Sequence, residues 1–205
     1  MTRPTSAVPI ASAEHVKLLD VQLLSDNWYT LRKITFALRR RDGQWQTLSR
    51  ETYDRGDGAV LLLFDPHRRT VVLTRQFRLP AFINGSADGL LVEACAGLID
   101  SDEPESCVRR EAEEETGFRV RQPRKVFEAY MSPGSVTEKL HFFVAEYEPQ
   151  DRLGHGGGLV EEGEDIEVVE MPLADALASI GTGAIQDAKT IMLLQHVALA
   201  LQSAG

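Results

Sequence analysis

An acidic run near the middle of the chain carries the residue types that could do chemistry. Pro104 suits the first turn of a helix and Gly117 suits its end, so about three and a half helical turns are predicted between them. The last of these turns carries four glutamates, Glu111, Glu113, Glu114 and Glu115. The C-terminal end of a helix carries partial negative charge and favours cations, so helix stability alone does not explain this run.

The spacing of these glutamates adds a second conflict. Glu111 lies three residues before Glu114 and four before Glu115, and like charges at these spacings destabilise a helix by roughly 0.2–0.5 kcal/mol per pair. A hard divalent cation resolves both conflicts, because Mg²⁺ binds carboxylate oxygens and keeps waters and phosphates in its remaining positions. The run therefore indicates a magnesium site, and the alternative is a solvated helix face.

The rest of the chain supplies the elements that must position this helix. Apolar and alternating segments predict strands at 29–38, 45–53, 59–64, 70–75, 89–95, 126–130, 140–147 and 166–171, with one more near Val120. Asp42-Gly43 predicts a hairpin turn, and helices are predicted at 173–180 and 187–201. Strands on both sides of an acidic helix indicate a mixed α/β sandwich.

Composition bounds the class of protein. A net charge of −9 over 205 residues argues against a nucleic-acid partner, although bound Mg²⁺ would still permit a nucleotide. The two cysteines indicate a reducing compartment, and no segment reaches the length of a signal peptide or a membrane span, so a cytoplasmic protein is expected.

Three regions are expected along the chain: a flexible arm at 1–15, an N-terminal β lobe at 16–57 and a main domain at 58–205. A glycine-rich loop at 154–158 leads to a second acidic run at 161–165. This loop is either a plain linker or a mobile flap that brings a late carboxylate to the metal site.

The residues around the first acidic run resemble the Nudix box. Its fixed positions are filled by Gly97, Glu103, Arg110, Glu111, Ala112, Glu114, Glu115, Gly117 and Phe118. The chain departs from the general box in one respect, because six residues rather than seven separate Glu103 from Arg110. This shortens the turn that enters the helix and leaves Arg110 to Gly117 unchanged.

Six further segments resemble the GDP-mannose hydrolase branch of the Nudix hydrolases, which lies beside the ADP-ribose pyrophosphatases. They are LLSDN at 23–27, YDRG at 53–56, RQFR at 75–78, AGLID at 96–100, MSPG at 131–134 and GGG at 156–158. The resemblance implies an α/β/α sandwich of mixed sheets with an N-terminal antiparallel β lobe. It also implies a Mg²⁺-dependent hydrolase, with Mn²⁺ as a possible substitute, that splits a nucleotide sugar. The N-terminal strands would be exchanged in a homodimer.

Carried over position by position, the resemblance implies four groups of site residues. The metal ligands would be Glu111, Glu115, Glu164 and the carbonyl of Ala96. The catalytic base would be Glu138 or Glu164, with Glu114 supporting the metal site or binding a second ion. Substrate contacts would come from Trp28, Arg50, Glu51, Arg78, Gly97, Leu98 and Lys189. Gly97, Glu103, Arg110 and Gly117 would be structural, with Arg110 orienting a box glutamate.

Some of these positions have an ordinary structural explanation as well. Trp28 could be a half-buried aromatic residue, and Arg50 with Glu51 could be a solvated pair. The guanidinium fork of Arg78 suits a diphosphate, and Lys189 lies near a helix start, where the dipole disfavours a cation unless it has a partner. The loop is two residues longer than the resemblance leads us to expect, and Gly163 stands where an acidic residue is expected.

The resemblance ranks three functions. Hydrolysis of GDP-mannose to GMP and mannose 1-phosphate comes first, and hydrolysis of ADP-ribose comes second. The alternative from a different class is a module that binds a nucleotide without cleaving it. Such a module would be expected to lose box carboxylates, and this sequence retains them.

Overall fold

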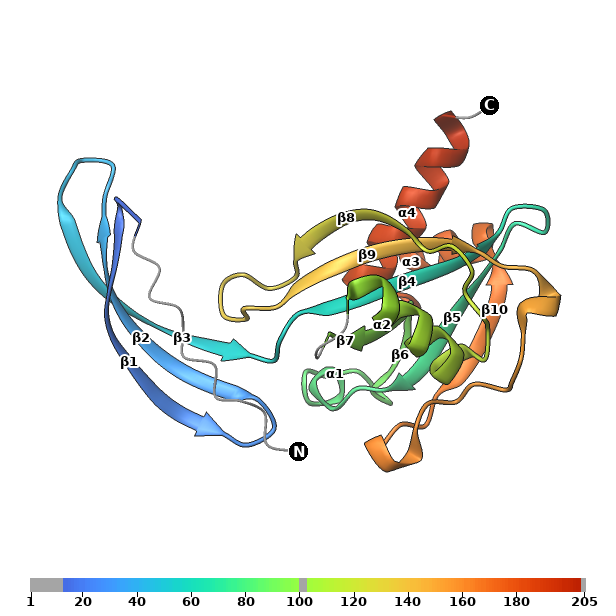
Figure 1. Cartoon of the computed structure of the whole chain (residues 1–205), viewed down its shortest axis with the longest axis horizontal. Helices are drawn as coiled ribbons and strands as arrows, with labels where there is room; N and C mark the ends of the chain where they lie inside the picture. The colour runs from blue at the N-terminus through green and yellow to red at the C-terminus, as the bar shows by residue number, and fades with distance from the viewer. Residues whose placement is uncertain (1–12, 100–102, 204–205) are drawn as a thin grey trace. The chain divides into compact units, whose positions relative to one another are not determined.

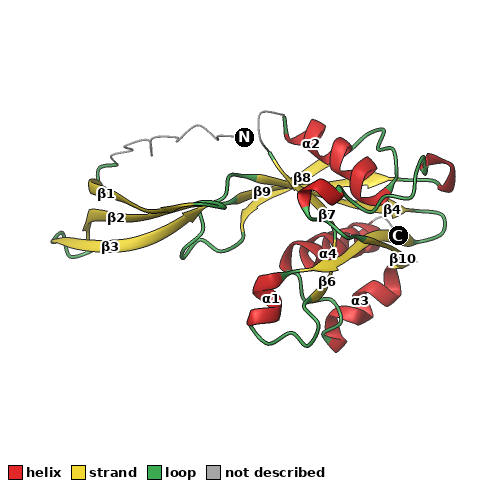
Figure 2. Cartoon of the chain, turned by 90° about the horizontal axis from the view of Figure 1, so that it is seen from below, coloured by secondary structure: helices red, strands yellow, loops and turns green. Residues whose placement is uncertain are grey.

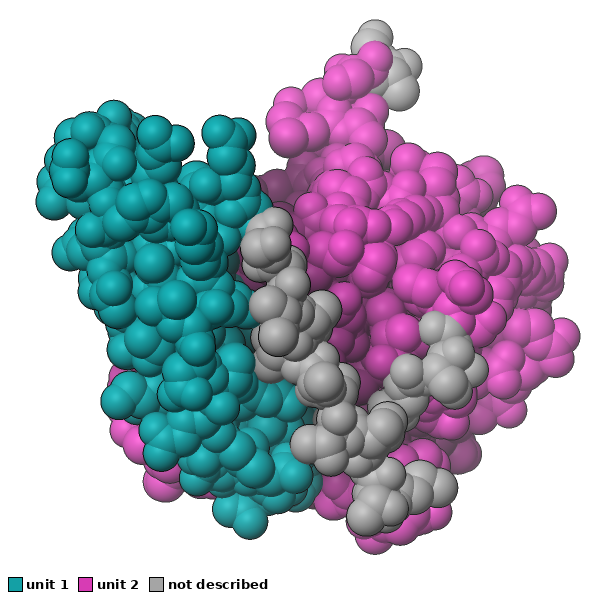
Figure 3. Space-filling model, turned by 60° about the vertical axis from the view of Figure 1, so that its left-hand side comes forward, with its two compact units in different colours: residues 1–55, 132–138 teal, residues 56–131, 139–205 magenta. Residues whose placement is uncertain are grey.

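The computed structural model describes residues 13–99 and 103–203 (Figure 1). The predicted arm therefore lies almost wholly outside the described residues, as do Asp100 and the two residues after it. The chain divides into two compact units, one of Met1–Arg55 with Ser132–Glu138 and one of Gly56–Met131 with Lys139–Gly205 (Figure 3). The first unit includes a late segment, 132–138, that sequence reasoning placed in the main domain.

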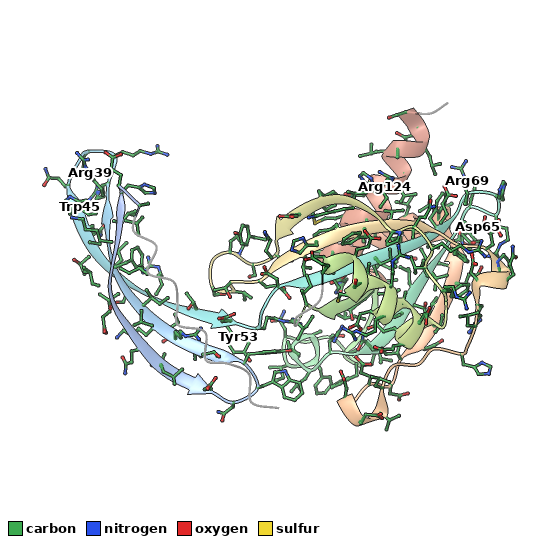
Figure 4. The ribbon with its side chains drawn as sticks, viewed as in Figure 1. Arg39, Trp45, Tyr53, Asp65, Arg69 and Arg124 are labelled. Atoms are coloured by element: carbon green, nitrogen blue, oxygen red, sulfur yellow. The ribbon has the colours of Figure 1, made fainter. Side chains whose placement is uncertain are left out.

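The first unit is a three-stranded antiparallel sheet of β1 (Val16–Asp26), β2 (Thr30–Arg39) and β3 (Trp45–Asp54) in that order. The predicted hairpin is present, with Gly43 at φ +83° in the turn and Arg39 paired with Trp45 where the strands begin to separate (Figure 4). The late segment joins this sheet through two backbone bonds, from Tyr53 N–H to the Ser135 carbonyl at 2.7 Å and from Thr137 N–H to the Tyr53 carbonyl at 3.1 Å.

The second unit is built on a seven-stranded sheet. Its main path runs β10 (Glu167–Pro172), β5 (Thr70–Phe77), β4 (Gly58–Asp65), β9 (Lys139–Glu146) and β8 (Arg124–Tyr130). Two short strands lie off this path, β6 (Leu90–Glu93) paired with β5 and β7 (Cys95–Leu98) paired with β4. The β4–β9 pair is parallel and the other pairs are antiparallel, so the sheet is mixed.

Helices cover both faces of this sheet (Figure 2). Every residue of β4 is buried, and its side chains alternate between two cores. One set contacts the core that contains α3 (Leu173–Thr182) and α4 (Ala188–Ser203), namely Val60, Leu62 and Phe64. The other set contacts the core of α2 (Pro104–Glu111), namely Ala59, Leu61 and Leu63. The predicted α/β/α sandwich is confirmed.

Four local features differ from the sequence predictions. The strand predicted at 89–95 is interrupted at Ala94, because its N–H donates to Thr190 Oγ1 at 2.6 Å. No strand forms near Val120, where Phe118 and Arg152 make only an isolated bridge. A short helix, α1 (Leu79–Ile83), begins beside Pro80, and α2 continues into a π-helical turn, η1 (Ala112–Thr116).

Two 3₁₀ turns, η2 (Pro149–Asp151) and η3 (Val160–Glu162), complete the elements of the described chain. None of its helices combines the length and the apolar character needed to cross a membrane.

Candidate active site

The glutamates of the acidic run are presented by α2 and its π-helical extension. Glu103 is the N-cap of α2, and its carbonyl accepts the Cys107 N–H at 3.1 Å. Thr116, fully buried, donates its hydroxyl to the Ala112 carbonyl at 2.5 Å, and Gly117 ends the π turn at φ +76°. π turns occur often at functional sites, and this one changes the angular spacing of the glutamates that follow Glu111.

Two of these glutamates point into the protein. Glu115 is 2 % exposed, and its carboxylate accepts the Ala96 N–H at 3.3 Å and the Cys95 thiol. Glu111 lies directly over Gly97, where an added Cβ would come 2.1 Å from Glu111 Oε1. The glycine is therefore required because the carboxylate occupies the space of a side chain.

Burial perturbs both carboxyl groups. It raises the pKa of Glu111 to about 7 and the pKa of Glu115 to about 8. The negative charge of Glu164 contributes to both of these shifts, whereas Arg110 opposes the shift at Glu111. Arg110 Nη1 lies 2.8 Å from Glu111 Oε1 and 3.1 Å from Glu114 Oε2, so one arginine is shared by two box glutamates.

The glycine-rich loop is attached to the end of this helix. Gly157 N–H donates to the Glu115 carbonyl at 2.9 Å and Gly158 N–H donates to the Glu114 carbonyl at 3.1 Å. These bonds satisfy carbonyls that a helix end leaves unpaired. A Cβ on Gly156, at φ +70°, would lie 2.4 Å from the Glu115 carbonyl oxygen, so the glycines permit close approach of the loop to the helix.

The same loop carries Glu164 toward the box carboxylates. Glu164 is half-buried, and its Oε2 accepts the Leu159 N–H at 2.9 Å. A Cβ on Gly158 would come 2.4 Å from Glu164 Oε2, so this glycine also makes room for a carboxylate. The plain-linker interpretation does not explain these contacts.

The carboxylate set fits a divalent cation in its chemistry. Hard oxygen donors from α2, η1 and the loop lie near enough to raise one another's pKa values, and Arg110 provides limited compensating charge. Among residues 13–99 and 103–203, no three His, Cys, Asp or Glu side chains are already drawn together closely enough to hold an ion. A bound cation would supply the attraction that these repelling groups lack.

Arg78 and Lys189 meet at a residue that sequence reasoning missed. Glu93, 3 % exposed, accepts Arg78 Nε at 2.7 Å through Oε2 and Lys189 Nζ at 2.6 Å through Oε1. Lys189 also donates to Asp187 Oδ1 at 2.9 Å, so two carboxylates offset its unfavourable place at the start of α4. The sequence signal that could have identified Glu93 is its place as the single acidic residue at the end of the otherwise apolar strand β6.

The remaining predicted residues of the second unit lie close to the box. Leu98 is half-buried, and its carbonyl accepts the Cys107 thiol at 3.4 Å. Gly117 allows the loop to approach, since a Cβ there would lie 2.4 Å from the Gly154 carbonyl oxygen.

Four predicted residues belong to the first unit. Trp28 is 77 % exposed and contacts Tyr29 edge-on, so the half-buried alternative for this residue is wrong. Arg50 and Glu51 are exposed on β3, and Arg50 Nη1 donates to the Ser49 carbonyl at 2.8 Å. Glu138 Oε1 lies 3.3 Å from Arg55 Nε.

Comparisons with known proteins cover most of the chain. Residues 54–194 match the NUDIX domain, and residues 15–53 match the family described as the GDP-mannose pyrophosphatase NudK N-terminal domain. A GDP-mannose pyrophosphatase of Cronobacter sakazakii is 52 % identical over 90 % of this chain and 96 % of its own length. One of Pectobacterium atrosepticum is 53 % identical over 88 % and 93 %. The fold resembles that of a crystal structure of an ADP compounds hydrolase, with a TM-score of 0.70, 19 % identity and coverage of 95 % and 98 %.

Replacing Glu115 by Gln tests the charge balance of the site. Because the folded pKa of Glu115 is raised from 4.5 to about 8, its stabilising contribution is complete below pH 4.5 and is lost as the pH rises through 8. In EDTA at pH 8.5, Glu115→Gln should therefore raise the free energy of unfolding by roughly 1–3 kcal/mol and abolish stabilisation by added Mg²⁺. Denaturant unfolding measures both effects. Exposed Glu113→Gln is the matched control, and equal behaviour of the two variants would contradict the assignment.

Replacing Gly156 by Ala tests the attachment of the loop. The new Cβ clashes with the Glu115 carbonyl oxygen and strains a backbone at positive φ, so the loop should detach and Mg²⁺ should bind roughly tenfold more weakly. Gly154→Ala is the control, because no atom lies within 4 Å of a Cβ there. Mg²⁺ titration followed by thermal unfolding makes the comparison. Unchanged Mg²⁺ affinity in Gly156→Ala would rule out a role for the loop.

Proposed function

The chain belongs to the Nudix hydrolase family, and on this premise we propose that it hydrolyses GDP-mannose to GMP and mannose 1-phosphate. The observation that carries the proposal is the grouping of half-buried Glu111 and buried Glu115 against the Ala96–Gly97 backbone with Glu164 nearby, because a bound cation would relieve the repulsion among these carboxylates. Supporting evidence for the substrate is the identity of about half of the residues to GDP-mannose pyrophosphatases along almost the whole chain.

We propose Mg²⁺ as the cation, with Mn²⁺ as a possible substitute. Glu111, Glu115, Glu164 and the carbonyl of Ala96 would hold it. When bound, the cation would neutralise the diphosphate and make a water molecule more acidic. Arg110 would keep Glu111 and Glu114 oriented, because its guanidinium contacts both carboxylates.

Two carboxylates remain candidates for the base that takes the proton of the attacking water. Glu164 is supported by its electrostatic influence on Glu111 and Glu115. Glu138 is supported by the resemblance, and its Oε1 lies 3.3 Å from Arg55 Nε, a contact that would orient its carboxylate. In either case water attacks phosphorus, the P–O–P bridge breaks, and the two phosphate products leave.

The substrate contacts are assigned by chemical type. The exposed ring of Trp28 offers a surface on which a base can stack, and Arg50 and Glu51 offer polar groups to the nucleotide. Arg78 and Lys189 would bind the diphosphate or the sugar. Gly97, whose added Cβ would come 2.1 Å from Glu111 Oε1, and its neighbour Leu98 would offer their backbone to the substrate.

A comparison of substrates tests this function. With Mg²⁺, we expect kcat/KM for GDP-mannose to exceed the values for GDP-glucose, ADP-ribose and a dinucleoside polyphosphate by at least about tenfold, because unpaired polar groups in the wrong complex are costly. A tenfold preference for ADP-ribose would refute the substrate, and no cleavage of any diphosphate would favour the binding module.

Replacing Glu111 by Gln tests the metal site. Glu111→Gln should lower kcat at least about a hundredfold while the fold is retained.

We also propose that the protein is a homodimer with exchanged N-terminal strands. The first unit exposes large apolar side chains on and beside β1, including Leu19, Val21, Leu23 and Leu24. The second unit, taken by itself, exposes another group around α1, consisting of Phe77, Leu79, Phe82, Ile83 and Leu90. Apolar patches of this kind mark interaction surfaces.

Light scattering tests the assembly. At micromolar concentration we expect twice the chain mass of 22.7 kDa, and Ile83→Asp, which places a charge on a side chain that is 75 % exposed, should shift the mass toward the monomer. A wild-type monomer would refute the dimer. We further infer a reducing compartment, the cytoplasm, because the chain has only two cysteines, Cys95 and Cys107, and both are buried among the apolar residues of the α2 core.

A further inference from the structure

The contact of Glu93 with two cations is the feature of the second unit that the box does not explain. Its side chain is 4 % exposed, and each carboxylate oxygen accepts one charged donor, Arg78 Nε at 2.7 Å and Lys189 Nζ at 2.6 Å. Arg78 follows β5 and Lys189 lies in the first turn of α4. One carboxylate thus joins two elements that are distant in sequence.

A purely structural role does not require such a cluster. Burying charged groups carries a large desolvation penalty, and an apolar replacement of similar volume is often neutral or stabilising. What an ion cluster provides is defined placement, since each oxygen of the carboxylate fixes one donor in distance and direction. The two cations are held next to each other despite their mutual repulsion.

Arg78 is anchored on one side only. Its Nε is bound to Glu93, its side chain is 40 % exposed, and its terminal nitrogens make no hydrogen bond within the described part of the chain. Lys189 uses two of its three donors on Glu93 and Asp187. Both cations therefore keep capacity for an anionic ligand while their positions are fixed.

The anchor is also connected to the box through successive residues of one chain segment. Ala94 N–H donates to Thr190 Oγ1, which in turn donates to Asp187. Two residues further on, Ala96 N–H donates to Glu115. The segment from Glu93 to Ala96 thus links the cation pair to the carboxylates proposed to hold the metal.

We propose that Glu93 is a positioning residue for substrate binding, whose carboxylate fixes Arg78 and Lys189 side by side to receive the diphosphate of the nucleotide sugar. The inference rests on the proposed function of this site and adds to it a residue that acts through two others. Glu93 itself carries the wrong charge to bind the anion.

Glu93→Gln tests the role, because it keeps the volume and removes the charge that both cations share. We expect KM to rise about tenfold while kcat changes less than about threefold. The variant binds the substrate less well, because the two cations lose their fixed positions, but it keeps the groups that perform the chemical step. In an Arg78→Ala background the same substitution should raise KM only about threefold, because one of the two groups it positions is already absent. The assay uses whichever diphosphate the wild-type enzyme cleaves fastest.

Asp65→Asn is the matched control. Asp65 is equally buried, at 3 % exposed, and its carboxylate pairs with Arg68 at 2.6 Å in the β4–β5 turn (Figure 4). It should lower the unfolding midpoint, as Glu93→Gln does, and leave KM within about twofold. If Glu93→Gln fails to fold, Glu93→Asp keeps the charge but withdraws the carboxylate by one methylene, and KM should still rise at least about threefold.

Three results would overturn the inference. They are a KM within twofold of wild type in a folded Glu93 variant, full additivity with Arg78→Ala, and an equal rise of KM in Asp65→Asn. Each of these leaves the hydrolase function standing. Absence of hydrolysis by the wild-type protein would refute the proposed function and this role together.

Discussion

The arrangement of the second unit depends on holding negative charge where a helix repels it. Glu111, Glu114 and Glu115 lie at the C-terminal end of α2 and η1, and Glu164 approaches from the loop. Several features reduce the repulsion locally: Arg110 contacts two of the carboxylates, and amides of Gly157 and Gly158 occupy helix carbonyls. Glycines stand where a Cβ would collide with these carboxylates or with the helix backbone. Most positions of the box motif are thus explained by what closely spaced carboxylates require from their neighbours.

The cluster of Arg78 and Lys189 is under the opposite constraint, because here two positive charges must be held close together. Arg78 and Lys189 repel each other, and Glu93 holds both by accepting a hydrogen bond from each, while Asp187 accepts a second one from Lys189. The two clusters are tied by the interruption between β6 and β7, where the backbone leaves the sheet ladder at Ala94 to bond Thr190. The interruption therefore joins the segment between Glu93 and Ala96 to the helix that carries Lys189.

Much of this could be predicted from the sequence, because the strongest signals are local. The alternating and apolar strands, the hairpin at Asp42-Gly43, and the helix between Pro104 and Gly117 each follow from period or turn chemistry. The missed features are set by distant partners. Ala94 leaves the ladder because of a residue 96 positions later, and Glu93 appears as a single charge in an apolar strand until Arg78 and Lys189 fold against it. The π turn has no local sequence signal, and Val120 fills the α2 core without pairing in a strand.

Two features lower the stability of the isolated chain: repulsion among carboxylates and exposure of large apolar side chains. Binding of another component would relieve each of them. Buried carboxylates with pKa values raised to about 7 and 8 make the metal-free protein less stable as the pH rises, so the same charges that would hold a cation weaken the protein without one. The exposed apolar side chains of β1 and of α1 likewise lose stabilisation that a covering surface would restore. Natural proteins tolerate such local deficits where function needs them. Both deficits are relieved by association, the first by an ion and the second by another protein surface, so stability and activity are expected to rise together when the assembly is complete.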